Sequence, residues 1–173
     1  MYEVIKLEVL KLPKLIVVGK KFRYSYEALD NGDNRLPGFW NMCYEDNAFA
    51  PLESQMEYIY NSSHAGIFFD WHSGDSNFSY IVGMLMSEGA SIPEGYTAYE
   101  LAETEIALCW VKCKSLAETR AVPFESTAKA IKDINRSCAG MKWCIDLYHH
   151  SRSTIPDNND EVILDCYIPL DWQ

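Results

Sequence analysis

The chain has 173 residues, an apolar fraction of 48% and a formal net charge of −10 at pH 7, and this length suits one compact domain with two internal modules. The negative charge would repel a phosphate backbone and no Lys/Arg face is clustered, so we expect no direct nucleic-acid binding. No stretch approaches the roughly 18 apolar residues of a membrane span, and the N-terminus lacks the apolar region of a signal peptide. We expect a cytoplasmic protein without membrane attachment, and cationic small molecules are the partners that this charge would tolerate best.

The cysteines indicate neither disulfides nor a metal site. All six lie at positions 43, 109, 113, 138, 144 and 166 and show no paired framework, which favours reduced thiols. Cys109 and Cys113 have no second pair at zinc spacing, and the adjacent His149 and His150 would point to opposite faces of a strand. The sequence therefore predicts no metal and no cofactor.

The first half predicts a strand, a helix and two further strands. Alternating residues at 2–10 and 15–24 read as strand with a break at Pro13, and a helix should open near Pro37 after a turn at 31–34. Helical spacing recurs briefly at residues 52–60. Residues 64–71 and 78–86 then form a predicted hairpin.

The second half repeats that order. A strand is surest at 106–111, and Phe124, Ala128, Ile131 and Ile134 share one face of a helix opened by Pro123. Strands at 143–150 and 161–169 close the chain. The repetition predicts an α+β fold of duplicated modules, at about 1–90 and 91–173, with helices packed on antiparallel or mixed sheet.

The strand that begins at residue 143 carries an unusual acid. With a period of two, Trp143, Ile145 and Leu147 share one face, whereas Cys144, Asp146 and Tyr148 share the other. An isolated ionised carboxylate is expensive to bury. Asp146 must therefore be solvated, paired, neutralised or waiting for a ligand.

A second acid, Asp165, lies in the last strand. If Leu164 and Cys166 share the core face with Ile145, a symmetric hairpin would set Asp165 directly opposite Asp146. Two carboxylates set directly opposite each other repel, and this repulsion would raise the pKa of one of them. We therefore hypothesise a coupled pair, which an arrangement on opposite faces would contradict.

Seven short pieces occur in a defined order along nearly the whole chain. They are Val18-Gly19 with Arg23, Leu36–Trp40, Ala65–Phe68, Phe78–Gly83, Ile92–Gly95, Asp146–Tyr148 and Tyr167–Pro169. Together they resemble the GyrI-like small-molecule-binding domain, the effector-binding module of many AraC-type and MerR-type bacterial transcription regulators.

The resemblance implies two strand–helix–strand–strand (SHS2) modules around a pseudo-twofold, with a central ligand cleft that holds an acid. The family's acid is usually Glu in a Glu-x-Tyr pattern. Here that slot holds Asp146, followed by Tyr148, and the side chain is one methylene shorter. The shortening puts in doubt any chemistry that needs the full reach of Glu.

Aromatic side chains are the expected walls of such a cleft. Trp40, Tyr80, Trp110 and Tyr148 are the candidates, because rings stack on flat apolar ligands and attract cations over their faces. Each could equally belong to the core. With Asp146 and Asp165 they complete the predicted ligand-binding set.

Three functions are compatible with these residues. The first is a standalone, monomeric protein that binds drug-like hydrophobic or cationic molecules and passes a signal to a transcriptional partner. The second is a hydrolase of cyclopropane-containing alkylating compounds, with Asp146 as the base and Tyr148 or Tyr80 polarising the leaving side. The third is interaction with DNA gyrase, as for the family's namesake. The sequence leaves open whether the protein is an enzyme.

Overall fold

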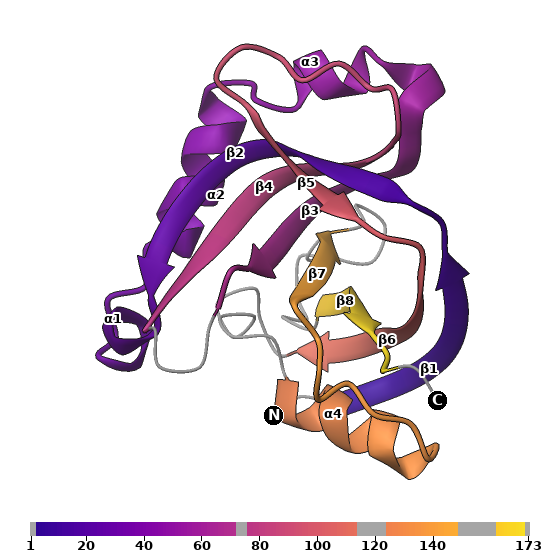
Figure 1. Ribbon diagram of the computed structural model, residues 1–173. Helices are drawn as coiled ribbons and strands as arrows, with labels where there is room; N and C mark the ends of the chain where they lie inside the picture. Colours follow the sequence, from indigo (N-terminus) through magenta and orange to yellow (C-terminus); the bar gives the residue numbers. More distant parts are fainter. Residues whose placement is uncertain (1–2, 72–75, 114–123, 149–161, 172–173) are drawn as a thin grey trace. The chain divides into compact units, whose positions relative to one another are not determined.

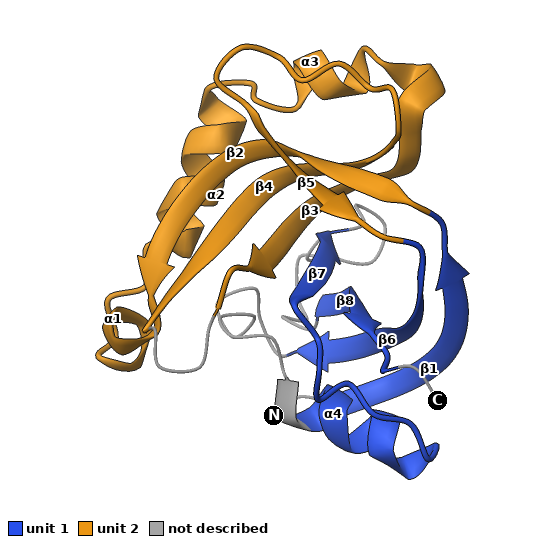
Figure 2. Ribbon diagram, in the orientation of Figure 1, with its two compact units in different colours: residues 1–13, 103–173 blue, residues 14–102 orange. Residues whose placement is uncertain are grey.

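The computed structural model describes residues 3–71, 76–113, 124–148 and 162–171 (Figure 1). The chain forms two compact units, coloured separately in Figure 2. Unit 1 comprises Met1–Pro13 and Glu103–Gln173, and unit 2 comprises Lys14–Ala102. Several residues of the sequence analysis lie outside the described ranges: Pro123, His149, His150 and the segment 151–160 between the last two predicted strands.

Unit 2 is an antiparallel sheet with short helices between its first two strands. Its elements in chain order are β2 (Leu15–Ser25), α1 (Tyr26–Asp30), α2 (Leu36–Glu45), α3 (Ala50–Glu53), a 3₁₀ turn η1 (Met56–Tyr58), β3 (Ile59–Phe69), β4 (Asn77–Ser87) and β5 (Thr97–Leu101). The strands are ordered β3-β4-β2-β5. The predicted helix start near Pro37 is confirmed. Pro37 lies in the first turn of α2, and the Leu36 N–H donates to Asn34 Oδ1 at 3.2 Å.

Unit 1 is also an antiparallel sheet, with one described helix. It contains β1 (Glu3–Leu12), β6 (Thr104–Cys113), α4 (Phe124–Asp133), β7 (Trp143–Tyr148) and β8 (Val162–Pro169). The strand order is β1-β6-β8-β7. Ile134 does not extend the helix as predicted: α4 ends at Asp133, Asn135 has a φ of 58°, and Ile134 is 41% exposed.

The predicted α+β class and the repeated element order are confirmed. β2-α2-β3-β4 and β6-α4-β7-β8 follow the same order of elements. In space β4 lies between β2 and β3, and β8 likewise lies between β6 and β7. The compact units nevertheless differ from modules at 1–90 and 91–173. The N-terminal β1 pairs with β6, and β5 pairs with β2, so each sheet gains an outer strand from the other half of the sequence.

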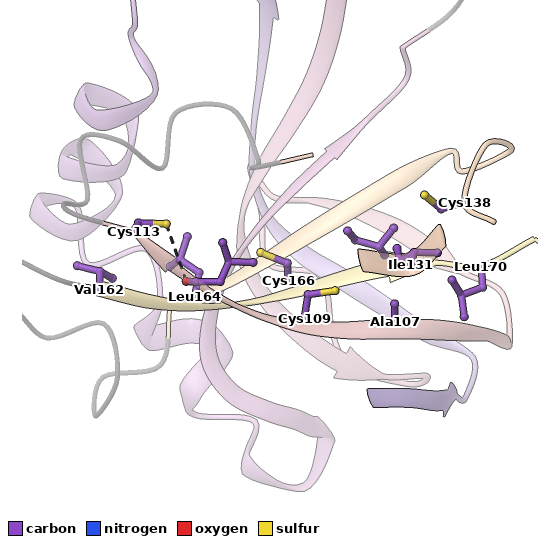
Figure 3. Close-up of a cluster of buried hydrophobic side chains, with 11 residues drawn as sticks. Ala107, Cys109, Cys113, Ile131, Cys138, Val162, Leu164, Cys166 and Leu170 are labelled. Atoms are coloured by element: carbon purple, nitrogen blue, oxygen red, sulfur yellow. Dashed lines mark hydrogen bonds between the residues drawn. The ribbon is translucent and has the colours of Figure 1, made fainter. Parts of the chain in front are cut away.

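One face of the unit 1 sheet packs beneath α4. Ile131 of α4 lies against alternate residues of β6 and β8, with Cys109, Val111, Leu164 and Cys166 among the buried members. Figure 3 shows this cluster, which we call the α4 face. All six cysteines are free and buried.

No helix in the described parts of the chain is long and apolar enough to cross a membrane.

Candidate functional site

The register of the β7–β8 hairpin separates the two predicted acids. Asp146 lies opposite Cys166, and Leu147 lies opposite Asp165. Adjacent strand residues point to opposite faces, so Asp146 and Asp165 lie on opposite sides of the sheet. The hypothesis of a coupled carboxylate pair is therefore wrong. Both faces of these strands are buried, so alternation could not distinguish the two registers.

Asp146 lies on the α4 face. Its cross-strand neighbour Cys166 belongs to the cluster beneath α4, and Tyr148, two residues along β7, packs against the same cluster. Cys109 in turn lies opposite Cys166. Cys109, Cys166 and Asp146 therefore form a row across three strands, with one carboxylate at its end.

Burial decides the protonation of Asp146. The side chain is 1% exposed, and its Oδ1 has no hydrogen-bond partner within the described residues. Loss of water raises the pKa of Asp146 to about 7, and a hydrogen bond with the Cys166 thiol lowers it only partly. Burial therefore favours the neutral acid over a pH range in which a free aspartate is ionised.

The neighbouring thiols remain protonated. Burial, reinforced by the nearby Asp146 carboxyl, raises the pKa values of Cys144 and Cys166 well above that of a free thiol. A thiolate is the reactive form of cysteine, so these residues are unsuited to nucleophilic catalysis. They form an apolar surround for the acid, with Cys166 as a weak donor.

Trp110 and Asp165 meet on the opposite face of the same sheet. They are cross-strand partners on β6 and β8, and Asp165 is 7% exposed. The Lys6 ammonium from β1 lies 4.4 Å from the centre of the Trp110 ring. This ring face therefore already carries a cation from the protein itself.

Trp40 and Tyr80 are brought together in unit 2. The Trp40 Nε1–H donates to Tyr80 Oη at 3.0 Å, and Tyr80 is 2% exposed whereas Trp40 is half-buried. Gly66 makes this contact possible, because a Cβ there would lie 2.0 Å from Tyr80 Oη and 3.2 Å from the Trp40 ring. The six predicted site residues thus form three pairs: Asp146–Tyr148, Trp110–Asp165 and Trp40–Tyr80.

The contacts of His64 in unit 2 were not predicted from the sequence. His64 is 5% exposed, and its Nε2 lies 3.2 Å from Glu53 Oε1 while its Nδ1 lies 3.2 Å from Tyr44 Oη. The Phe49 ring stacks on the imidazole at 3.6 Å between centres. Tyr44 lies in α2, and Phe49 and Glu53 lie at the N-cap and the end of α3. No local spacing therefore relates them to His64 in β3. Within the described residues no cluster of His, Cys, Asp and Glu could hold a metal ion.

Comparisons with known proteins establish the fold. No family model matches the sequence, and no curated protein matches it. A candidate bacterial transcription regulation protein from Staphylococcus aureus MU50 aligns with a TM-score of 0.60 at 17% identity, over 96% of this chain and 99% of that one. SAV2435, in complex with tetraphenylphosphonium, aligns at 0.58 and 14% over 96% and 94%.

The C-terminal domain of EcmrR aligns with a TM-score of 0.50 at 9% identity, over 97% of this chain and 98% of that domain. These identities are low, so the similarities concern the arrangement of helices and strands. The chain has the α+β fold found in a protein related to transcription regulation, in SAV2435 bound to tetraphenylphosphonium and in EcmrR, which was also solved in complex with DNA. This fold is consistent with the GyrI-like resemblance.

Proposed function

We propose that the chain is a GyrI-like binding protein for hydrophobic, cationic small molecules, with Asp146 as the acid that recognises the charge. The shared fold supports this proposal, since SAV2435 was solved with tetraphenylphosphonium, a lipophilic cation. The observation that carries it is the fully buried Asp146 carboxyl, whose pKa burial raises to about 7.

Asp146 Oδ1 has no hydrogen-bond partner among the described residues, so a negative charge on this carboxyl would be poorly compensated. An ionised carboxylate in an apolar site is costly without a partner, and the hydrogen bond with the Cys166 thiol offsets the burial of Asp146 only partly. A cation without hydrogen-bond donors would stabilise the ionised form while losing little hydration of its own. Proton loss and ligand binding would then be coupled at Asp146.

Aromatic side chains would supply the apolar part of recognition. Tyr148 lies on the same face as Asp146 and packs against the α4 cluster. The hydrogen-bonded Trp40–Tyr80 pair in unit 2 is a second aromatic surface with a fixed geometry. We propose Tyr148 as a ligand-contacting group beside Asp146, and the Trp40–Tyr80 pair, taken by itself within unit 2, as a separate aromatic surface, because ring faces attract cations. The biological role would be sensing or sequestering such compounds, with a transcriptional partner as the receiver of the signal.

Calorimetric titration with tetraphenylphosphonium between pH 5 and pH 8 tests the proposal. A cation that binds the ionised acid competes with a proton, so affinity should fall by about tenfold for each pH unit below the pKa. Asp146→Asn should bind at least about tenfold more weakly at pH 8 and lose the pH dependence.

Asp133→Asn is the matched control, because it makes the same chemical change at the exposed end of α4 in the same unit. It should keep both the affinity and the pH dependence of the wild type. Binding by Asp146→Asn that equals the wild type at every pH would contradict the role of this acid.

Hydrolysis of a strained electrophile is the second candidate. A carboxyl with a pKa of about 7 suits a general base at neutral pH, and Tyr148 lies on the same face of β7. The shorter reach of Asp favours binding over catalysis. Incubation with a cyclopropane-containing alkylating compound should yield a water adduct, detected by mass spectrometry, that Asp146→Asn does not form; no adduct above the buffer rate would leave binding alone.

A further inference from the structure

The outer edge of β1 is an exposed apolar strand. β1 pairs with β6 through one edge and is the terminal strand of the unit 1 sheet. Its side chains Ile5, Val9 and Leu10 are 43%, 40% and 39% exposed. Among residues 3–71, 76–113, 124–148 and 162–171, no strand pairs with the second edge of β1. An edge of this kind is a template for another strand.

The terminal strand of unit 2 lacks these properties. β5 has five residues, against ten in β1, and only Glu100 within it is exposed. Its last residue, Leu101, is fully buried. The long exposed apolar edge is therefore a particular feature of β1.

The sequence of β1 is complementary to its own reverse. When the strand is read in both directions from Leu7, Lys6 mirrors Glu8 and Ile5 mirrors Val9. Further out, Val4 mirrors Leu10 and Glu3 mirrors Lys11. Next to Leu7 each positive charge thus matches a negative charge. The irregular pairing between Val4 and Lys6 puts Val4 on the face opposite Leu10, so the outer residues match in sequence alone. Self-complementarity is what a twofold symmetric interface requires.

We propose that two copies of the chain associate by antiparallel pairing of their β1 edges about a twofold axis at Leu7. In this register Lys6 lies beside Glu8 of the partner copy, and Ile5 lies beside Val9 of the partner copy. Directly opposed charges of unlike sign stabilise an antiparallel pair. Such a dimer would differ from the monomer expected from the sequence.

The charges on β1 are already arranged for this contact. Lys6 and Glu8 are two residues apart on one face, with Lys6 Nζ 2.7 Å from Glu8 Oε1. Pairing with a second copy would extend this ion pair into four alternating charges. The pairing of β1 with β6 is irregular between Val4 and Lys6, so the most regular part of the new contact would lie close to the axis.

A charge-exchange experiment by analytical ultracentrifugation tests the proposal. The wild type should approach twice the chain mass as concentration rises to about 1 mM. Lys6→Glu places acid against acid in both symmetric contacts, and Glu8→Lys places base against base. Each variant alone should dimerise at least about tenfold more weakly than the wild type.

Mixing the two variants is the decisive step. The Lys6→Glu chain has two acids at these positions and the Glu8→Lys chain has two bases, so only the mixed dimer has complementary contacts. We expect the mixture to regain the dimer mass that each variant lacks, although neither chain can form the internal Lys6–Glu8 pair. Glu100→Lys on β5 is the control and should dimerise as the wild type does.

Three results would overturn the proposal: a wild type that stays monomeric at about 1 mM, single variants that dimerise as well as the wild type, or a mixture that remains monomeric. Hydrogen exchange on the wild type is a second test that needs no variant. Amides of β1 should exchange more slowly in concentrated than in dilute protein, and equal rates would also contradict pairing at this edge.

Discussion

The two units follow the same order of elements, but the faces beneath their helices differ in chemistry. In unit 2 that face is aromatic and carries polar contacts: Trp40 donates to Tyr80, and both ring nitrogens of His64 lie near polar atoms. In unit 1 the face is aliphatic and rich in thiols, and it holds one carboxyl, Asp146, whose Oδ1 has no partner in the described structure.

The difference concerns how each unit compensates its buried polar groups. A polar network with its partners in place fixes side chains and rigidifies a core. A buried acid without compensation costs stability, and perturbed acids of this kind gather at functional sites. The buried acid of unit 1 therefore has a different electrostatic environment from the polar contacts of unit 2.

The largest expected effect is on the pH dependence of stability. The pKa of Asp146 rises from 3.8 to about 7 on folding, so between these pH values the folded protein holds a proton that the unfolded chain has lost. The free energy of unfolding should therefore fall as pH rises through this window, by about 4 kcal/mol in total from this group.

Urea unfolding of Asp146→Asn from pH 4 to pH 8 should lack that fall, whereas Asp133→Asn, at the exposed end of α4, should retain it. An equal pH dependence in the wild type and in Asp146→Asn would mean that the acid is not neutralised by burial. The contrast between the two units would then disappear.

A smaller effect is expected from Gly66→Ala in unit 2. The new methyl group would overlap Tyr80 Oη and press on the Trp40 ring, so the aromatic pair would have to shift. Overpacking of this kind costs about 1–3 kcal/mol in the free energy of unfolding, measurable by thermal or urea unfolding.

Gly38→Ala is the matched control, since a Cβ at this α2 position has no atom within 4 Å. It should raise the unfolding free energy by about 0.5–1 kcal/mol, as Ala favours helix over Gly. If both substitutions were neutral, the Trp40–Tyr80 contact would not be a rigid part of unit 2.

Much of the fold could be predicted from patterns of short range. Alternation located β1 and β2 on either side of Pro13, and helical spacing with Pro37 located α2. The pairing of β1 with β6 and of β5 with β2 could not be predicted, because these contacts join distant parts of the sequence. The local sequence of an outer strand does not show which strand it pairs with.

The candidate site could be predicted only in part. The period of two correctly grouped Asp146 with Tyr148, and the aromatic candidates Trp40 and Tyr80 are in contact. The position of Asp165 could not be predicted, since a shift of one residue between two strands buried on both faces moves a side chain across the sheet. Cys166, which faces Asp146, was treated as core for the same reason.

The central claim is that Asp146 is a neutralised acid that a cationic ligand ionises. The most direct measurement is a carbon-13 NMR titration of the aspartate carboxyl groups, with Asp146→Asn for assignment, with and without saturating tetraphenylphosphonium. We predict a midpoint for Asp146 near pH 7 in the free protein and a fall of more than about one pH unit in the complex. A midpoint near 3.8 in the free protein, or one that the ligand does not move, would contradict the claim.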